Sequence, residues 1–211
     1  MSTALPESPT RPPADTSPHP RLTIAEYFAL DSMALRRGEY IEGQRIEMAG
    51  ASRRHVTISK NIVYGLESQV EDRDCDVFAT DTRVRANGHY YYPDVGVVCG
   101  EYLVDALNPD TLTNPTVLIE VLSDSTEVVD RGSKFRDYRR LPSLRTYLMV
   151  TQDYPRVEQY ERDTGGWRFV ETEGLSGVVE LSAIDCRLEM ARIYRRVPFS
   201  APEIPTDSAM S

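Results

Sequence analysis

The sequence predicts an α/β fold in which a mixed β-sheet core is flanked by helices, with an additional β-hairpin region toward the C-terminus. Three observations predict this class. Apolar, β-branched runs of strand length alternate with stretches of helical periodicity, and strands with helices before and between them are typical of α/β proteins. Short turns containing glycine join several of the expected strands as hairpins. A chain of 211 residues has the length of one domain.

The expected elements of the N-terminal half begin with a capped helix. Thr23 followed by Glu26 forms a capping box, so Ile24 to Ala29 is expected to begin a helix. Ser52 is expected to begin a second helix. Hairpin turns are expected at 42–43 and 87–88, and strands at 39–41, 45–48, 77–79, 82–85, 91–99 and 117–122.

The C-terminal half combines one helix with further strands. The segment from Gly100 to Asn114 contains Pro109 and is expected to be an irregular loop. A helix is expected from about Val128 to Arg140, ending before a proline. Strands are expected at 146–151, 157–162, 167–171 and 178–181, with a hairpin turn at 163–166 and a terminal segment at 188–194.

The two ends of the chain are rich in proline and are expected to be disordered, which leaves residues 22–197 as the folded domain between tails 1–21 and 198–211. No apolar run reaches the length of a bilayer and no signal peptide is recognisable, so no membrane association is expected. Cys75, Cys99 and Cys186 are odd in number and lack metal-type spacing. This favours a reducing cytoplasm over a disulfide framework.

The formal net charge of −9 argues against a broadly basic surface for nucleic acid. A local basic surface is still compatible with it, because arginines cluster at several places. For most of them, a solvated surface of mixed charge is the simpler interpretation. The clusters are Arg36 and Arg37, Arg53 and Arg54, Arg83 and Arg85, and Arg131, Arg136, Arg139 and Arg140.

Two acidic residues and a lysine suggest chemistry. Asp94 and Glu120 each interrupt an apolar run that is expected to be a buried strand. A charge there is costly unless it is paired or bound to a metal, so the two suggest a site for a divalent cation and phosphate. Lys134 follows on the expected helix and, with Lys60, is one of two lysines among 24 basic residues. Its retention fits a need for a compact ammonium, and chance would also explain it.

The expected helix carries Asp130, Lys134 and Tyr138 at spacings that place them on one face. If this helix packs across the sheet, Lys134 can reach Asp94 and Glu120. The alternative is an ordinary solvent-facing Asp–Lys pair beside a half-buried tyrosine. Spacing alone leaves both interpretations open.

Five segments also occur in the order found in a known family. They are Glu39-Tyr40-Ile41-Glu42-Gly43, Met48-Ala49-Gly50-Ala51-Ser52 with His55, Tyr92-Pro93-Asp94-Val95, Ile119-Glu120-Val121-Leu122-Ser123, and Asp130-Arg131-Gly132-Ser133-Lys134 with Tyr138. By these segments the chain from about Leu22 to Val197 resembles the Uma-type family of "putative restriction endonucleases", within the PD-(D/E)XK nuclease superfamily. The resemblance implies a restriction-endonuclease-like core.

The resemblance also implies a metal site. Asp94 and Glu120 would hold Mg²⁺, for which Mn²⁺ would substitute, with help from the backbone carbonyl of Val121. The superfamily usually has its lysine two residues after the glutamate, where this chain has Leu122. In the Uma-type pattern the following helix supplies the lysine, and Lys134 occupies that place.

Other residues match the family less decisively. Glu39 fits an acidic catalytic residue contributed by the N-terminal region. His55 matches the pattern, although a single histidine on a helix is more often structural, and Tyr138 would either touch phosphate or pack. Asp124 stands where the family commonly has proline, which is expected to alter only a loop.

Together these observations predict a Mg²⁺-dependent endonuclease that hydrolyses DNA phosphodiester bonds. A homodimer is expected, because two related sites suit the symmetry of duplex DNA. Two alternatives remain. One is a nuclease-fold DNA-binding or regulatory protein with weak or lost catalysis, which the acidic net charge favours. The other is a metal-free, two-carboxylate hydrolase that acts on a sugar.

Overall fold

The computed structural model describes residues 21–124 and 126–199. Most of the two ends that were expected to be disordered therefore lies outside the described residues. The helices are α1 (Ile24–Met33), α2 (Arg53–Val70), α3 (Glu127–Val129), α4 (Phe135–Tyr138) and α5 (Met190–Ile193), with a π-helical segment η1 (Asp130–Lys134) and a 3-10 turn η2 (Ser182–Ile184).

The remaining elements are strands. They are β1 (Gly38–Ile41), β2 (Gln44–Glu47), β3 (Cys75–Ala79), β4 (Arg83–Ala86), β5 (His89–Tyr91), β6 (Val95–Cys99), β7 (Val104–Asp105), β8 (Asn108–Leu112), β9 (Val117–Val121), β10 (Thr146–Val150), β11 (Arg156–Arg162), β12 (Trp167–Glu173), β13 (Val178–Leu181) and β14 (Cys186–Glu189). Three sheets result.

The central sheet has the order β12-β11-β10-β9-β6-β3, and a second sheet has the order β2-β1-β5-β4-β8-β7. Each contains one parallel pair, β9 with β10 and β4 with β8, among antiparallel ones. Strands β13 and β14 form a separate antiparallel pair near the C-terminus. The α/β class, the mixed sheet and the additional C-terminal hairpin are thus confirmed, although the sheet is divided in two.

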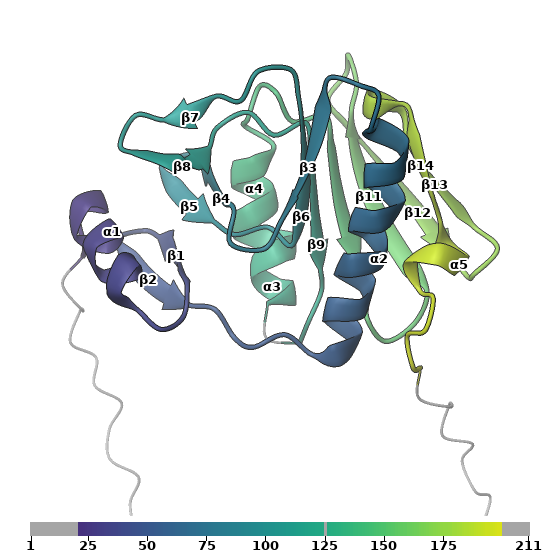
Figure 1. The fold of residues 1–211 in the computed structure, drawn as a ribbon, viewed down its shortest axis with the longest axis horizontal. Coiled ribbons are helices and arrows are strands. Elements are labelled where there is room, and N and C mark those ends of the chain that lie inside the picture. The colour runs from purple at the N-terminus through teal and green to yellow at the C-terminus, as the bar shows by residue number, and fades with distance from the viewer. Residues whose placement is uncertain (1–20, 125, 200–211) are drawn as a thin grey trace, which may run out of the picture.

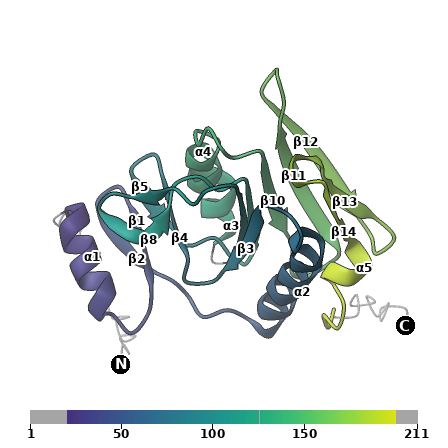
Figure 2. The same ribbon diagram turned by 45° about the horizontal axis from the view of Figure 1, so that its top comes forward.

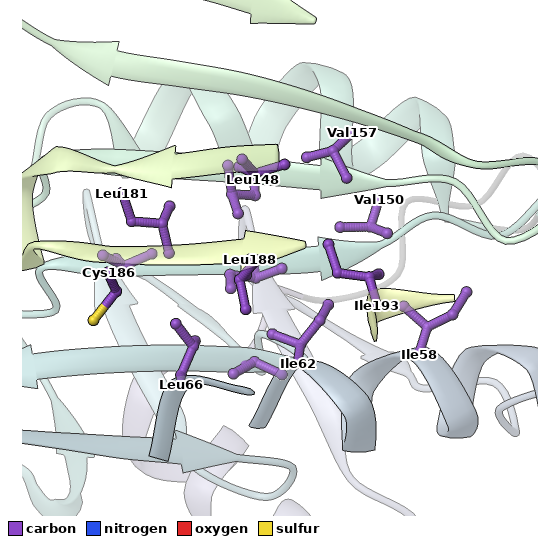
Figure 3. Close-up of a cluster of buried hydrophobic side chains, with 14 of the residues drawn as sticks. Ile58, Ile62, Leu66, Leu148, Val150, Val157, Leu181, Cys186, Leu188 and Ile193 are labelled. Atoms are coloured by element: carbon purple, nitrogen blue, oxygen red, sulfur yellow. The ribbon is translucent and has the colours of Figure 1, made fainter. Parts of the chain in front are cut away.

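Helix α2 covers one face of the central sheet and the continuous segment α3–η1–α4 covers the other (Figures 1 and 2). Alternate residues of β9 separate in the same way, since Ile119 packs in the cluster containing α2 and Leu118 packs in the cluster containing α4. Glu120 is two positions from Leu118 and therefore faces η1 and α4. Figure 3 shows part of the α2 cluster, where Ile62, Leu66, Leu148 and Leu188 gather between helix and strands.

The local signals for helix starts and hairpin turns are confirmed. The Thr23 side chain and Glu26 exchange both contacts of a capping box at the start of α1. The Ser52 hydroxyl accepts from the backbone N–H of His55 at the start of α2. Gly43 and Gly88 take the positive φ values, 84° and 82°, that their two hairpin turns require.

One predicted strand is two strands. Residues 91–99 were expected to be continuous, but β5 ends at Tyr91 in the second sheet and β6 begins at Val95 in the central sheet. The chain therefore crosses between the sheets immediately before Asp94. Pro93 lies in the crossing and has no N–H with which to continue a ladder.

The expectation of an irregular loop at residues 100–114 is wrong. This segment forms β7 and β8, which pair with a register shift next to Val104 and Asp105. Pro109 lies in the irregular part of this hairpin, where a missing N–H is tolerated. The Asp105 carboxylate accepts from the Leu107 backbone N–H, which closes the turn.

The cysteines were interpreted as favouring a reducing cytoplasm over a disulfide framework, but the structure contains a disulfide. Cys75 on β3 and Cys99 on β6 are directly opposite in the antiparallel pair and are bonded to each other, whereas Cys186 is a buried free cysteine. The pairing comes from strand register, which cysteine number and spacing do not reveal. No helix among the described residues is long and apolar enough to cross a membrane.

Candidate active site

Acidic side chains from both sheets converge on the helical segment that follows β9. Glu39 comes from β1 of the second sheet, and Glu120 from β9 of the central sheet. Asp94 directly precedes β6, and the pairing of Val95 with Ile119 places it opposite Glu120 on the neighbouring strand. The crossing between the sheets thus brings distant segments to one site.

Lys134 lies at the centre of this group. Its Nζ atom is 3.0 Å from Glu39 Oε1, 3.1 Å from Glu120 Oε1 and 3.1 Å from Asp130 Oδ1. The contact with Glu120 is also a hydrogen bond, whereas the contact with Asp130 is an ion pair without hydrogen-bond geometry. Lys134 is only 5% exposed. The interpretation of Lys134 as part of a solvent-facing pair is therefore wrong.

Asp94 is held by a different set of donors. Its Oδ2 accepts from the backbone N–H of Val121 at 2.7 Å and lies 3.1 Å from His55 Nε2. His55 is in the first turn of α2, so the capped start of that helix directs it toward the site. Burial lowers the pKa of His55, but its contact with Asp94 outweighs this and the pKa is raised overall.

The charges within the cluster do not balance. Burial raises the pKa of Glu120 well above its usual value, and the neighbouring carboxylates add to this against the opposing effect of Lys134. Burial alone would lower the pKa of Lys134, but Glu120, Glu39 and Asp130 raise it well above its usual value. Lys134 therefore remains an ammonium at neutral pH. One ammonium cannot neutralise three neighbouring acidic groups, and a bound cation would favour their ionised forms.

Tyr138 packs and does not face a cleft. It is fully buried, and its hydroxyl donates to Glu120 Oε1 at 3.2 Å. Of the two interpretations of Tyr138, the structure favours packing, with the added consequence that the hydroxyl orients Glu120. Val121 contacts the site through its N–H, and a role for its carbonyl stays a prediction.

Asp130 is a site residue that the sequence did not assign. Its side chain is 2% exposed and pairs with Lys134. Asp130 and Lys134 are the first and last residues of the π-helical segment η1, and π-helical turns inside helices frequently occur at functional sites. The four-residue spacing from Lys134 was the available signal, but it did not distinguish a site from a surface pair.

A second polar cluster lies behind Lys134. The buried carboxylate of Asp137 accepts from the hydroxyl of Tyr91 at 2.7 Å and from Asn87 at 2.9 Å, and it lies 2.6 Å from His89 Nδ1. The Tyr91 ring centroid is 6.0 Å from the Lys134 ammonium. Burial raises the pKa of Asp137, but these hydrogen bonds lower it overall.

The lowered pKa predicts how the contribution of Asp137 depends on pH. A carboxyl group with a depressed folded-state pKa stabilises the protein above its unfolded pKa, and this contribution is lost as pH falls through the folded value. Asp137→Asn should therefore lower the free energy of unfolding by about 1–3 kcal/mol at pH 6 and by less near pH 3. Urea unfolding at both pH values measures this, with the exposed Asp72→Asn as control. An equal cost at both pH values would contradict the assignment.

Comparison with known proteins identifies a family that matches the sequence and a solved structure with the same fold. Residues 24–191 match the model of the Uma2 family, which is described as "Putative restriction endonuclease". Two relatives are uncharacterized proteins of Synechocystis sp. One is 34% identical over 76% of this chain and 93% of its own length, and the other is 31% identical over 87% and 97%.

A solved structure gives the same fold at lower identity. The crystal structure of a protein from Anabaena variabilis, described as a putative nuclease belonging to DUF820, superposes with a TM-score of 0.68. The sequences are 18% identical, and the match covers 82% of this chain and 97% of that one. From the family match over most of its length and the two sequence relatives, the chain belongs to the Uma2 family of "putative restriction endonucleases".

Proposed function

We propose that this protein is a Mg²⁺-dependent endonuclease that hydrolyses phosphodiester bonds of DNA. The observation that carries the proposal is the buried Lys134 ammonium, which lies 3.0 Å from Glu39 on β1 and 3.1 Å from Glu120 on β9, the strand next to Asp94. The family description supports a nuclease. A homodimer remains our expectation, because two sites related by two-fold symmetry suit the two strands of a duplex.

The residues present fit a magnesium ion. Among residues 21–124 and 126–199, no three His, Cys, Asp or Glu side chains form a ready-made metal cage. Mg²⁺ is usually held by one or two carboxylates and keeps waters and phosphate oxygens as its other ligands. Asp94 and Glu120 would hold it, with the Val121 carbonyl as a third protein ligand. When bound, the ion would polarise the scissile phosphate and make an attacking water more acidic.

Lys134 would act as a charged donor. Its raised pKa keeps it protonated at neutral pH, so it would not serve as a general base. It would instead donate to the attacking water or to the phosphate oxygens as negative charge develops there. Glu39 and Asp130 would hold the ammonium in place, since each lies within 3.1 Å of it.

Asp94 and Glu120 are oriented by neighbours that do not react. The Val121 N–H and His55 both contact Oδ2 of Asp94, which leaves Oδ1 for a cation. The Tyr138 hydroxyl donates to Glu120. These contacts would lower the cost of arranging both carboxylates around an ion.

The alternative with a specific observation behind it is a DNA-binding or regulatory protein of the same fold. The net charge of −9 and the burial of Lys134 and Glu120, which are 5% and 2% exposed, favour it. Sugar hydrolysis is less well supported, because the two-carboxylate mechanism has no place for a lysine ammonium 3.1 Å from one of the acids. Cleavage assays on duplex, single-stranded and branched DNA in Mg²⁺ separate a nuclease from a binding protein.

Metal binding should also appear in the stability of the protein. A ligand that binds only the folded state stabilises it by about 2.7 kcal/mol at 100 times its Kd, or roughly 5–10 °C in Tm for a domain of this size. Mg²⁺ or Mn²⁺ should therefore raise the Tm of the wild type, and Asp94→Asn should abolish most of the increase. Asp72→Asn serves as an exposed control. An unchanged shift in Asp94→Asn would place the metal elsewhere.

A further inference from the structure

A buried carboxylate outside the proposed active site joins the two segments that carry Glu39 and Asp94. Asp31, near the end of α1, is 1% exposed. Its Oδ1 accepts from the Gly38 backbone N–H at 2.8 Å and from Arg45 at 2.9 and 3.0 Å. Its Oδ2 accepts from the Tyr92 hydroxyl at 2.8 Å and from Arg83 at 2.9 Å. Both oxygens are thus fully engaged.

Two of the residues that contact Asp31 are close in sequence to residues of the proposed site. Gly38 immediately precedes Glu39 on β1, and Tyr92 lies two residues before Asp94 in the crossing between the sheets. The two segments also meet directly, because the Tyr92 N–H donates to Glu39 Oε1 at 3.3 Å. Asp31 therefore holds the backbone at Gly38, next to Glu39. It also holds the side chain of Tyr92, which lies two residues before Asp94.

The rest of the cluster makes this connection rigid. Arg83 is 7% exposed and its guanidinium carbon lies 4.9 Å from the Phe28 ring centroid and 5.1 Å from that of Tyr92. A side chain at Gly38 would come within 2.7 Å of Arg45, so the arginine packs directly on the β1 backbone. A buried charge with all its hydrogen bonds made holds its partners in one arrangement.

We propose that Asp31 is a positioning residue that sets the placement of Glu39 and Asp94 around Lys134. Its catalytic consequence rests on the proposed endonuclease activity, but its effect on the surroundings of Lys134 does not. Glu39 lies on β1 of the second sheet, whereas Glu120 lies on β9 of the central sheet. By holding β1, Asp31 would set the position of Glu39 relative to Glu120 and Lys134.

The experiment compares three variants chosen for matched chemistry. Asp31→Asn removes the charge at the centre of the cluster. Tyr92→Phe removes one hydrogen bond to Asp31 and keeps the ring, in case the first variant does not fold. Asp105→Asn is the control, because Asp105 is equally buried in the second sheet and accepts from a tyrosine hydroxyl and a backbone N–H, at Tyr90 and Leu107. Among the described residues, no hydrogen bond or ion pair joins Asp105 to Glu39, Asp94 or Lys134, or to Gly38 or Tyr92, which Asp31 holds.

The first measurement needs no activity. With only Lys60 and Lys134 in the chain, lysine labelled with ¹³C at Cε gives two NMR signals, and exposed Lys60 is an internal reference. Asp31→Asn and Tyr92→Phe should move the Lys134 signal, because Glu39 lies 3.0 Å from its ammonium. Asp105→Asn should leave both signals in place, even if its Tm falls equally.

The second measurement is steady-state cleavage of DNA in Mg²⁺. Asp31→Asn should lower kcat on the order of 10- to 100-fold, the effect of a misplacement of about 1 Å, with KM changed less than about twofold. Asp105→Asn should change neither. A Lys134 signal at its wild-type position in folded Asp31→Asn and Tyr92→Phe would overturn the positioning role. Absence of cleavage by the wild type would instead overturn the proposed function, and the NMR result would still decide the role of Asp31.

Discussion

Alanine at Asp94, Glu120 or Lys134 is expected to reduce cleavage of DNA to near the limit of detection. Removing one group that stabilises transition-state charge typically costs on the order of 10²–10³ in kcat, and removal of a carboxylate that we propose to hold the metal should cost at least as much. The losses should be strongly non-additive, because the three side chains act as one unit. Single-turnover cleavage of a labelled duplex in Mg²⁺ measures each variant and the triple variant.

The two lysines of the chain provide a matched control. Lys60→Ala removes an exposed lysine from α2 and should leave cleavage unchanged. Lys134→Arg should be severely impaired, since a planar guanidinium cannot replace a compact ammonium among three carboxylates. Full activity of Lys134→Ala would remove the lysine from the mechanism. Cleavage should also fall steeply with added salt, because a protein of net charge −9 must hold phosphate with a local basic surface.

The second large effect is on stability without metal. Lys134→Ala leaves the carboxylates of Glu39, Glu120 and Asp130 buried without their shared counter-charge, and breaking a buried ion pair typically costs about 3–5 kcal/mol. The raised pKa of Lys134 means that its contribution is fully present at pH 7 and is lost only as pH rises through the folded-state value, above 10.5. Urea unfolding at pH 7 in EDTA measures the loss.

Replacing Glu120 with a neutral residue should restore part of the stability lost in Lys134→Ala. The pKa of Glu120 is raised by burial and by its acidic neighbours, so its ionised form is unfavourable there, and Glu120→Gln replaces it with a neutral group of similar shape. The double variant Lys134→Ala with Glu120→Gln should therefore be more stable than Lys134→Ala alone. Lys60→Ala should stay within about 0.5 kcal/mol of the wild type. A double variant less stable than Lys134→Ala would contradict the interpretation that the carboxylates repel one another.

Local chemistry in the sequence was enough to place helix starts, tight turns and most strands. The capping box at Thr23 and the glycine turn at Gly43 depend on a few neighbouring residues, so they form as predicted. The nearly continuous apolar run of β9 likewise indicated a buried strand, and every residue of β9 is buried. The acidic residues that interrupt apolar segments, together with the family pattern, suggested Asp94, Glu120 and Lys134. The structure places Asp94 opposite Glu120 and Lys134 3.1 Å from Glu120.

What the sequence could not decide depends on contacts between distant segments. The division into two sheets places Asp94 at the crossing between β5 and β6, whereas an apolar run around a proline suggested one strand. The Cys75–Cys99 disulfide follows from the register of β3 against β6. The burial of Asp130 and Asp31 follows from packing, because a carboxylate four residues before a lysine, or near the end of a helix, looks the same in the sequence whether it faces solvent or core. Sequence patterns show which residues are neighbours along the chain. The site instead depends on which charged side chains, from distant segments, are buried next to one another.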